Sequence, residues 1–132
     1  MRYMLDTNTA SYVIKGNAVV HKHLLSVPMH EICISVITQA ELLFGVARKP
    51  SSAGLKTAVQ EFLLRVDILP WASEAAHQYA RLCTLLEHKG KIMGNMDLLI
   101  AAHALATKST LVTNDKAFRY VNDLSIIDWM HQ

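Results

Sequence analysis

The sequence predicts an α/β fold in which a short parallel β-sheet is flanked by helices on both faces. Short apolar segments rich in β-branched residues alternate along the chain with longer segments whose apolar residues recur at helical spacing. The chain has 132 residues, which is enough to bury one core, and no linker, repeat or low-complexity stretch divides it. Residues 1–132 are therefore predicted to form a single domain.

The order of the predicted elements follows from their periodicity and from the residues that end them. Gly16 and Asn17 end one helix, Pro28 ends another, and Gly90 follows a long helix for which Ser73 is the predicted N-cap. The pattern predicts strands at residues 2–5, 31–35, 68–69, 110–113 and 125–127, and helices at residues 9–15, 18–27, 37–48, 53–66, 73–89 and 97–107.

Composition excludes several classes of protein. A hydrophobic fraction of 52% excludes a disordered chain, and no apolar run is long enough to span a membrane. The first residues contain no long apolar segment of the kind found in a signal peptide. Cys33 and Cys83 both lie among apolar residues, so they are predicted to be reduced core thiols of a cytoplasmic protein.

Four acidic residues stand in apolar surroundings where a surface carboxylate is unusual. Asp6 ends the first strand, Glu41 lies inside an apolar helix, Asp97 opens another, and Asp115 follows the strand at 110–113. The carboxyl ends of parallel strands share one edge of a sheet, so these acids are predicted to converge there. Clustered carboxylates repel one another unless a cation lies between them, and oxygen ligands suit Mg²⁺ or Mn²⁺.

Each acid also has a local structural interpretation. Asp6 and Asp97 are candidate helix N-caps, and Asp115 follows Asn114 in a candidate turn. Thr38 and Glu41 have the spacing of a capping box. The convergence of all four acids on one edge favours the metal site over four separate caps.

Basic residues lie near every one of these acids in the sequence. The formal net charge is only +2, from 13 Lys and Arg against 11 Asp and Glu. If the four acids hold metal, the remaining surface carries 13 basic and 7 acidic side chains, a balance of +6. Cations around a metal–carboxylate centre suit a phosphodiester, although each one alone also fits a solvated helix end. These basic residues are Lys15, Arg48, Lys89, Lys91, Lys116 and Arg119.

Four short motifs, in order, resemble those of the VapC-like PIN-domain ribonuclease toxins of type II toxin–antitoxin systems. They are Met4-Leu5-Asp6-Thr7-Asn8; Ile34-Ser35-Val36-Ile37-Thr38-Gln39-Ala40-Glu41-Leu42-Leu43-Phe44-Gly45; Gly94-Asn95-Met96-Asp97-Leu98-Leu99-Ile100-Ala101-Ala102-His103-Ala104; and Leu111-Val112-Thr113-Asn114-Asp115, with Phe118 after it. The closing Asp128-Trp129 is also similar, so the resemblance covers nearly the whole chain.

The resemblance implies a PIN-like nuclease domain with endoribonuclease activity that depends on Mg²⁺ or Mn²⁺. It assigns catalysis and metal binding to four acids, and it assigns to Asn8 and Thr113 the orientation of the ligands and of water. The four acids are Asp6, Glu41, Asp97 and Asp115. The fourth acid varies among such proteins in position and identity. The resemblance also implies a homodimer, a cognate antitoxin that covers the active site, and an RNA substrate, which is a tRNA in some relatives.

The predicted reaction is hydrolysis by a metal-activated water, with metal held by Asp6 and Asp97 and the shell completed by Glu41 and Asp115. One alternative is a phosphatase of the haloacid-dehalogenase type, because residues 6–9 resemble its D-x-D-x-T motif, although Asn8 replaces the second Asp. Another is a catalytically silent module of the same fold that binds RNA or a partner protein. A zinc site is disfavoured because the pair at His21 and His23 has no matching Cys or His pair.

Overall fold

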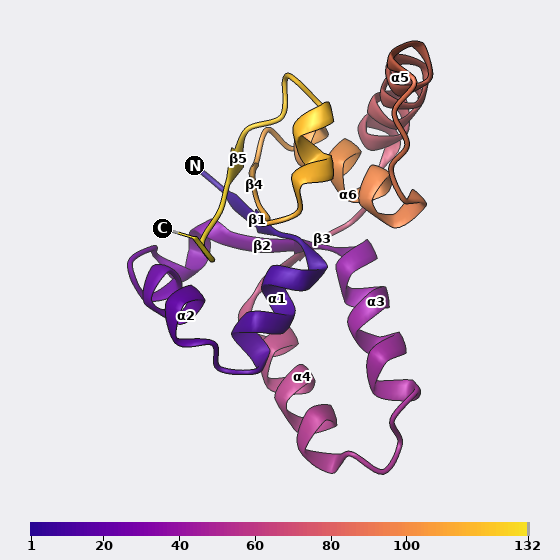
Figure 1. Cartoon of the computed structure of the whole chain (residues 1–132). Helices are drawn as coiled ribbons and strands as arrows, with labels where there is room; N and C mark the ends of the chain where they lie inside the picture. The colour runs from indigo at the N-terminus through magenta and orange to yellow at the C-terminus, as the bar shows by residue number, and fades with distance from the viewer. Residues whose placement is uncertain (132) are drawn as a thin grey trace.

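The computed structural model describes residues 1–131, which build one sheet with helices on both sides (Figure 1). Neighbouring strands are parallel throughout, in the order β3-β2-β1-β4-β5. The strands are β1 (Tyr3–Leu5), β2 (Ile32–Ser35), β3 (Asp67–Leu69), β4 (Thr110–Val112) and β5 (Ile126–Ile127). The predicted fold class is confirmed.

The helices occupy nearly the segments that the sequence predicts. They are α1 (Thr7–Ile14), α2 (Ala18–Leu25), α3 (Val36–Ala47), α4 (Ala53–Arg65), α5 (Ser73–Lys89) and α6 (Asn95–Ala106), with the 3-10 turns η1 (Met29–Glu31) and η2 (Lys116–Tyr120). Helices α1 and α6 each begin two residues earlier than predicted, because Asp6 and Gly94 are their N-caps. Within residues 1–131, no helix is both long and apolar enough to cross a membrane.

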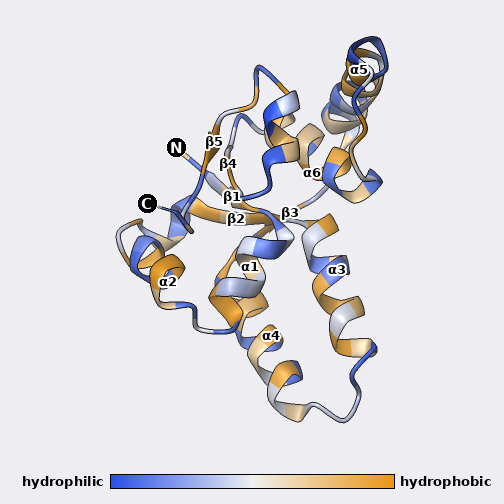
Figure 2. Cartoon of the chain, in the orientation of Figure 1, coloured by the Kyte–Doolittle hydropathy of each residue, from blue (hydrophilic) through white to orange (hydrophobic). Residues whose placement is uncertain are grey.

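Alternation along the strands divides the interior into two apolar clusters, one on each face of the sheet. Met4 and its strand neighbours Cys33 and Leu111 pack with residues of α5, α6 and η2. Leu5 and its neighbours pack with residues of α1, α2, α3 and α4 on the opposite face. Figure 2 shows the apolar strands between the two groups of helices. The sheet is therefore covered on both faces, as parallel sheets generally are.

Two smaller expectations have different outcomes. Cys33 and Cys83 are both free, as predicted, and burial raises the pKa of the Cys33 thiol. Ser73, however, is not the N-cap of α5: the carbonyl of Ala72 already accepts hydrogen bonds from the backbone N–H groups three and four residues ahead. Ser73 is instead the first helical residue, and the cap, Ala72, carries no side-chain hydrogen bond. At the other end, Gly90 adopts φ +65°, the left-handed conformation predicted for a terminating glycine.

Replacing Leu111 with Ala will strongly destabilise the protein, because Leu111 is fully buried at the centre of the sheet. We expect a loss of about 2–5 kcal/mol in the free energy of unfolding, measured by chemical denaturation. The matched control is Leu64→Ala on α4, where the side chain is 83% exposed and its loss should change stability little. Equal losses in both variants would contradict this view of the core.

Candidate active site

Asp6 lies at the carboxyl end of β1, where it caps α1 and is 4% exposed. Its Oδ1 accepts a 2.8 Å hydrogen bond from the backbone N–H of Thr9, and its Oδ2 accepts one of 2.6 Å from the hydroxyl of Thr113. Burial raises the pKa of Asp6, while these hydrogen bonds act in the opposite direction. The local interpretation of Asp6 as a cap is thus correct, but it does not account for the contact with Thr113 from a distant strand.

Glu41 projects from α3 toward the start of α1, where the hydroxyl of Thr7 donates a short hydrogen bond to its Oε1. The capping-box interpretation is wrong, because the N-cap of α3 is Ser35, whose hydroxyl accepts from the backbone N–H of Ile37. Thr38 instead lies buried within the helix, and its hydroxyl oxygen is 3.3 Å from that of Thr7. Glu41 is therefore oriented by another element rather than by its own helix end.

Asp97 lies in the first turn of α6, and Gly94 is the N-cap of that helix. The interpretation of Asp97 as an N-cap is therefore wrong. Its pKa is raised to about 6, first by desolvation and then by the charges of Asp115, Asp6 and Glu41, in that order. No hydrogen bond from the described residues contributes to holding this carboxylate in its charged form. Carboxylates from three other segments of the chain thus act electrostatically on Asp97.

Asp115 follows β4 and caps η2, with its Oδ1 accepting a 3.0 Å hydrogen bond from the backbone N–H of Ala117. Its own backbone N–H donates to the hydroxyl of Thr113, also at 3.0 Å. The same hydroxyl donates to Asp6, so Thr113 connects two of the four acidic residues. The turn interpretation of Asp115 holds locally, and the turn directs this residue to the same edge of the sheet as Asp6.

Sequence reasoning and structure differ at the polar residues around the acids. Thr113 donates a hydrogen bond to Asp6, whereas Asn8 is exposed and forms no hydrogen bond to the four acids within residues 1–131. Thr7 was missed, although it lies directly between Asp6 and Asn8 in the first motif. The available signal was the position of Thr7 in the first turn of a helix that begins at the acidic edge.

The donor set consists of carboxylates, which suits a hard divalent cation. Within residues 1–131, no three Asp, Glu, His or Cys side chains lie close enough together to ligate one ion. Mg²⁺ generally retains several waters and takes only one or two carboxylates from the protein, so it does not require a closed protein cage. Repulsion by the neighbouring carboxylates contributes to the raised pKa of Asp97, and a bound cation would relieve this repulsion. The residues therefore fit a divalent ion.

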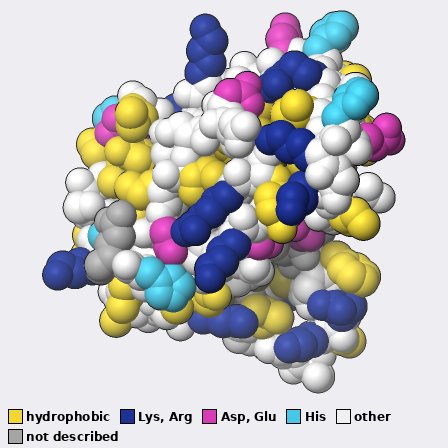
Figure 3. Space-filling model, turned by 45° about the horizontal axis from the view of Figure 1, so that its top comes forward, with side chains coloured by type: hydrophobic (Ala, Val, Ile, Leu, Met, Phe, Trp, Pro, Cys, Tyr) yellow, Lys and Arg dark blue, Asp and Glu magenta, His cyan; other side chains and the backbone are white. Residues whose placement is uncertain are grey.

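Two cationic side chains lie over aromatic rings of elements that begin or continue from the acidic edge, α3 and η2. On α3, the guanidinium of Arg48 lies 4.8 Å from the ring centroid of Phe44. Near η2, the Nζ of Lys91 lies 5.2 Å from the ring centroid of Tyr120. Figure 3 shows Lys and Arg side chains gathered around carboxylates and exposed apolar side chains on one face of the molecule. This surface favours a polyanionic substrate.

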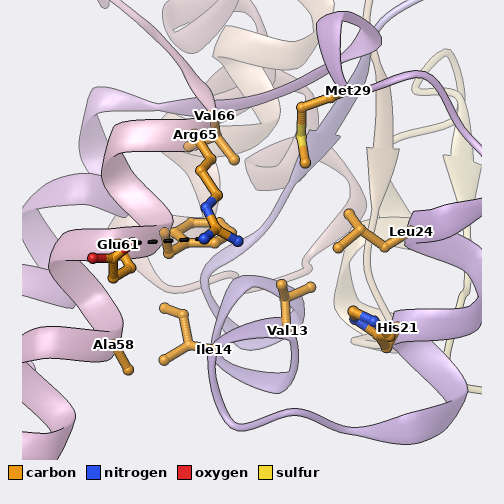
Figure 4. Close-up of a pocket in the computed structure, with 10 residues that line it drawn as sticks. Val13, Ile14, His21, Leu24, Met29, Ala58, Glu61, Arg65 and Val66 are labelled. Atoms are coloured by element: carbon orange, nitrogen blue, oxygen red, sulfur yellow. Dashed lines mark ion pairs between the residues drawn. The ribbon is translucent and has the colours of Figure 1, made fainter.

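A separate apolar pocket of about 280 Å³ lies between α1, α2 and α4 (Figure 4). Its rim carries an ion pair between Glu61 and Arg65, with 3.6 Å between the nitrogen and oxygen atoms. None of the four predicted acids lines this pocket. It is therefore not the centre at which these carboxylates converge.

The fold and site define a class: a parallel α/β protein with carboxylates at the carboxyl edge of its sheet and cations around them. Comparison with known families identifies the class more closely. The model of the PIN domain matches residues 3–124, and the chain therefore belongs to the PIN domain family. The haloacid-dehalogenase alternative finds no support in this comparison.

Individual relatives narrow the class further. Ribonuclease VapC2 of Rickettsia felis is 38% identical over 98% of both chains, and the tRNA(fMet)-specific endonuclease VapC of Shigella flexneri is 28% identical over 98% of both. The crystal structure of VapBC2 from Rickettsia felis, bound to a DNA fragment from their promoter, gives a TM-score of 0.90 at 38% identity, covering 98% of this chain and 99% of the other. A member of the VapBC family of toxin–antitoxin systems from Mycobacterium tuberculosis gives 0.71 at 25% identity, covering 96% of each.

These relatives match this chain along almost its whole length as well as theirs. The predicted class, a VapC-like PIN-domain endoribonuclease of the toxin type, is thereby confirmed. PIN nucleases generally depend on divalent metal, in agreement with the oxygen-rich donor set described above.

Thr113→Val will remove the hydroxyl that donates to Asp6 while keeping the shape of the side chain. Because that hydrogen bond lowers the pKa of Asp6, its loss should raise this pKa and shift the acidic limb of the pH–activity profile to higher pH. We also expect a stability loss of about 1.5–3 kcal/mol, typical of a hydrogen bond to a charged group. Thr57→Val, at an exposed position of α4, is the control. An unchanged acidic limb would show that Thr113 does not tune Asp6.

Asp97→Asn will make the metal-free protein more stable at neutral pH. The folded-state pKa of Asp97, about 6, lies above its ordinary value, so the folded state binds more protons between these two values and stability falls as pH rises through this window. Asn cannot ionise and escapes this loss. In chelator the variant should melt above the wild type near pH 7, and the difference should vanish near pH 4. Glu87→Gln, at an exposed position, should show no such crossover.

Proposed function

We propose that this chain hydrolyses RNA at the carboxyl edge of its sheet, where two of four clustered acids hold a divalent metal ion and the other two complete its shell directly or through water. These acids are Asp6, Glu41, Asp97 and Asp115. The observation that carries the proposal is the raised pKa of Asp97, about 6, to which carboxylates from three other elements contribute. Converging like charges are costly to a fold, and strongly perturbed carboxylates in this position are typical of functional sites.

Mg²⁺ or Mn²⁺ is the ion we propose, because all four groups are hard oxygen ligands. When bound, the ion lowers the pKa of a coordinated water and offsets charge on the phosphoryl oxygens. Asp6 and Asp97 hold the ion. No nucleophilic side chain is required for hydrolysis by this route.

The hydrogen bonds of the other residues define their proposed roles. Asp6 has a fixed orientation because Thr9 and Thr113 each bind one of its carboxylate oxygens. Glu41 keeps its second oxygen available while Thr7 binds the first, so it is suited to orient an attacking water. Asp115 is held at the edge of the site by the turn that follows β4.

The substrate and partners are proposed from the relatives. The relative from Shigella flexneri is named for a tRNA, so a tRNA is the first substrate to test for this chain. Toxin–antitoxin assemblies among the matching structures support a cognate antitoxin as partner. We propose a homodimer as the form that this antitoxin binds.

Asp97→Asn and Asp6→Asn will abolish RNA cleavage while the protein remains folded, because each change removes a charge needed to hold metal. Glu41→Gln should be nearly as severe. Glu61→Gln and Glu87→Gln, at exposed positions, should retain activity. The assay is cleavage of tRNA by purified protein in Mg²⁺ or Mn²⁺, with folding checked by circular dichroism. Normal activity in Asp97→Asn would disprove the site assignment.

The products of the same assay distinguish metal-activated water from attack by the ribose 2′-hydroxyl. Hydrolysis by water leaves a 5′-phosphate and a 3′-hydroxyl. Attack by the 2′-hydroxyl leaves a 2′,3′-cyclic phosphate. We expect the first pair of ends, and cyclic phosphate as the primary product would rule out the proposed chemistry.

A further inference from the structure

A groove of about 400 Å³ runs between α1 and α3 and reaches the candidate active site. Thr7 and Glu41 line the end of this groove that reaches the site, and they are also hydrogen-bonded to each other. Its floor is apolar, formed by side chains of α1, α3 and α4: Ile14, Leu42, Val46, Leu55 and Val59. Its volume lies within the range of about 300–1,000 Å³ that is usual for small-ligand clefts.

Phe44 lines this groove three residues beyond Glu41 on α3 and is 61% exposed. Other apolar residues of the same helix, such as Leu42, face the core, so the exposure of this ring is not required for packing. A single exposed apolar residue is ordinary in itself. This ring, however, lies beneath the guanidinium of Arg48 and beside an acid of the active site.

The groove is also rich in cations. Lys15, Arg48 and Lys49 all line it, whereas Glu41 is its only acid among the described residues. None of the three cations forms an ion pair within residues 1–131. From Glu41 to Arg48 the helix rises about 10 Å, so positive charge lies at a short distance from the carboxylates along one helix face.

We propose that this groove binds an unpaired nucleotide next to the cleaved phosphodiester, with its base stacked on Phe44 and its phosphates contacted by Lys15 and Arg48. Aromatic rings flanked by cations are the usual means by which proteins hold single-stranded nucleic acid, because every base has a face that can stack. The inference rests on the proposed RNA hydrolysis and adds the residues that would hold the strand beside the cleaved bond: Lys15, Phe44 and Arg48.

Double-stranded RNA does not satisfy this arrangement. In a duplex, the faces of each base are covered by its neighbours, and only an unstacked base can meet a side-chain ring. Tyr120, at the end of η2, offers a second ring that is 36% exposed and lies under Lys91. The aromatic ring of each cation–aromatic pair therefore lies on an element that also carries one of the acids. Glu41 is on α3 with Phe44, and Asp115 is at the start of η2, which ends at Tyr120.

The test measures binding of a short single-stranded RNA, and of the same RNA annealed to its complement, by fluorescence anisotropy. Asp97→Asn serves as the background, so that cleavage does not interfere. We expect Phe44→Ala to weaken single-strand binding on the order of tenfold or more, whereas Phe44→Trp restores it. Arg48→Gln should also weaken binding and reduce its salt dependence. The duplex should bind more weakly and respond little to Phe44→Ala.

Two controls separate this role from others. Leu64→Ala and Lys22→Gln change an exposed apolar residue and an exposed cation outside the groove, and both should bind normally. Equal binding of duplex and single strand, or normal binding by Phe44→Ala, would overturn the inference. A loss of binding accompanied by a changed oligomeric state in size-exclusion chromatography would also overturn it, because Phe44 would then belong to an interface between copies.

The outcome for the groove is distinguishable from the outcome for catalysis. In the cleavage assay without the Asp97 substitution, Phe44→Ala should raise KM for single-stranded RNA by a similar factor while kcat changes little. If the wild type cleaves RNA but Phe44→Ala leaves both binding and KM unchanged, the groove assignment fails and the proposed function stands. If the wild type binds the single strand through Phe44 but cleaves nothing, the proposed function fails alone.

Discussion

The pairing of β1 with β4 is the constraint on which the site depends, because it joins residues 107 positions apart in the chain. The backbone N–H of Asp6 continues the ladder onto the carbonyl of Val112, at 3.1 Å, and the hydroxyl of Thr9 donates to the same carbonyl. One residue further, Thr113 reaches back to Asp6 and accepts from the N–H of Asp115. The sheet thus ends in a network that fixes two acids together, and a shift in strand register would separate them.

Carboxylates that lie close together repel one another, so the fold must supply stabilising free energy elsewhere. Burial and the three neighbouring carboxylates raise the pKa of Asp97 to about 6, which lowers the stability of the metal-free fold at neutral pH. Apolar burial offsets this loss of stability, because Leu5, Val112 and the core residues around them are buried. The N-terminus of α6 partly offsets the charge on Asp97, because the first backbone N–H groups of a helix favour an anion. The site is therefore a locally destabilising cluster of charges at the edge of an otherwise well-packed sheet.

The sequence predicted the elements well because the alternation of short β-branched runs with helical periodicity depends on burial, which the sheet imposes on both faces. The four acids could be singled out because the carboxyl ends of parallel strands meet at one edge of a sheet, and their role there stays a prediction. Helix ends were predicted less well: Ser35 rather than Thr38 caps α3, and Ala72 rather than Ser73 caps α5. A cap depends on the backbone angles of one residue, which neighbouring packing sets and which residue type alone leaves undetermined. Thr7 was missed because its partner, Glu41, is 34 positions away and only the tertiary fold brings them together.

The net charge of +2 does not show that acidic and basic residues occupy different places along the strands and helices. Two of the acids, Asp6 and Asp115, lie at the ends of β1 and β4, and the other two are held near them by helices that begin at this edge. The cations of the groove lie farther along, at the ends of α1 and α3, where Lys15 and Arg48 follow the last helical turn. The carbonyl groups at the C-terminus of a helix favour a nearby cation. The positive charges of Lys15 and Arg48 therefore lie at the helix ends that are farther from the four acids. Within residues 1–131, Lys15 and Arg48 form no ion pair with these acids, so the two sets of charges do not neutralise one another.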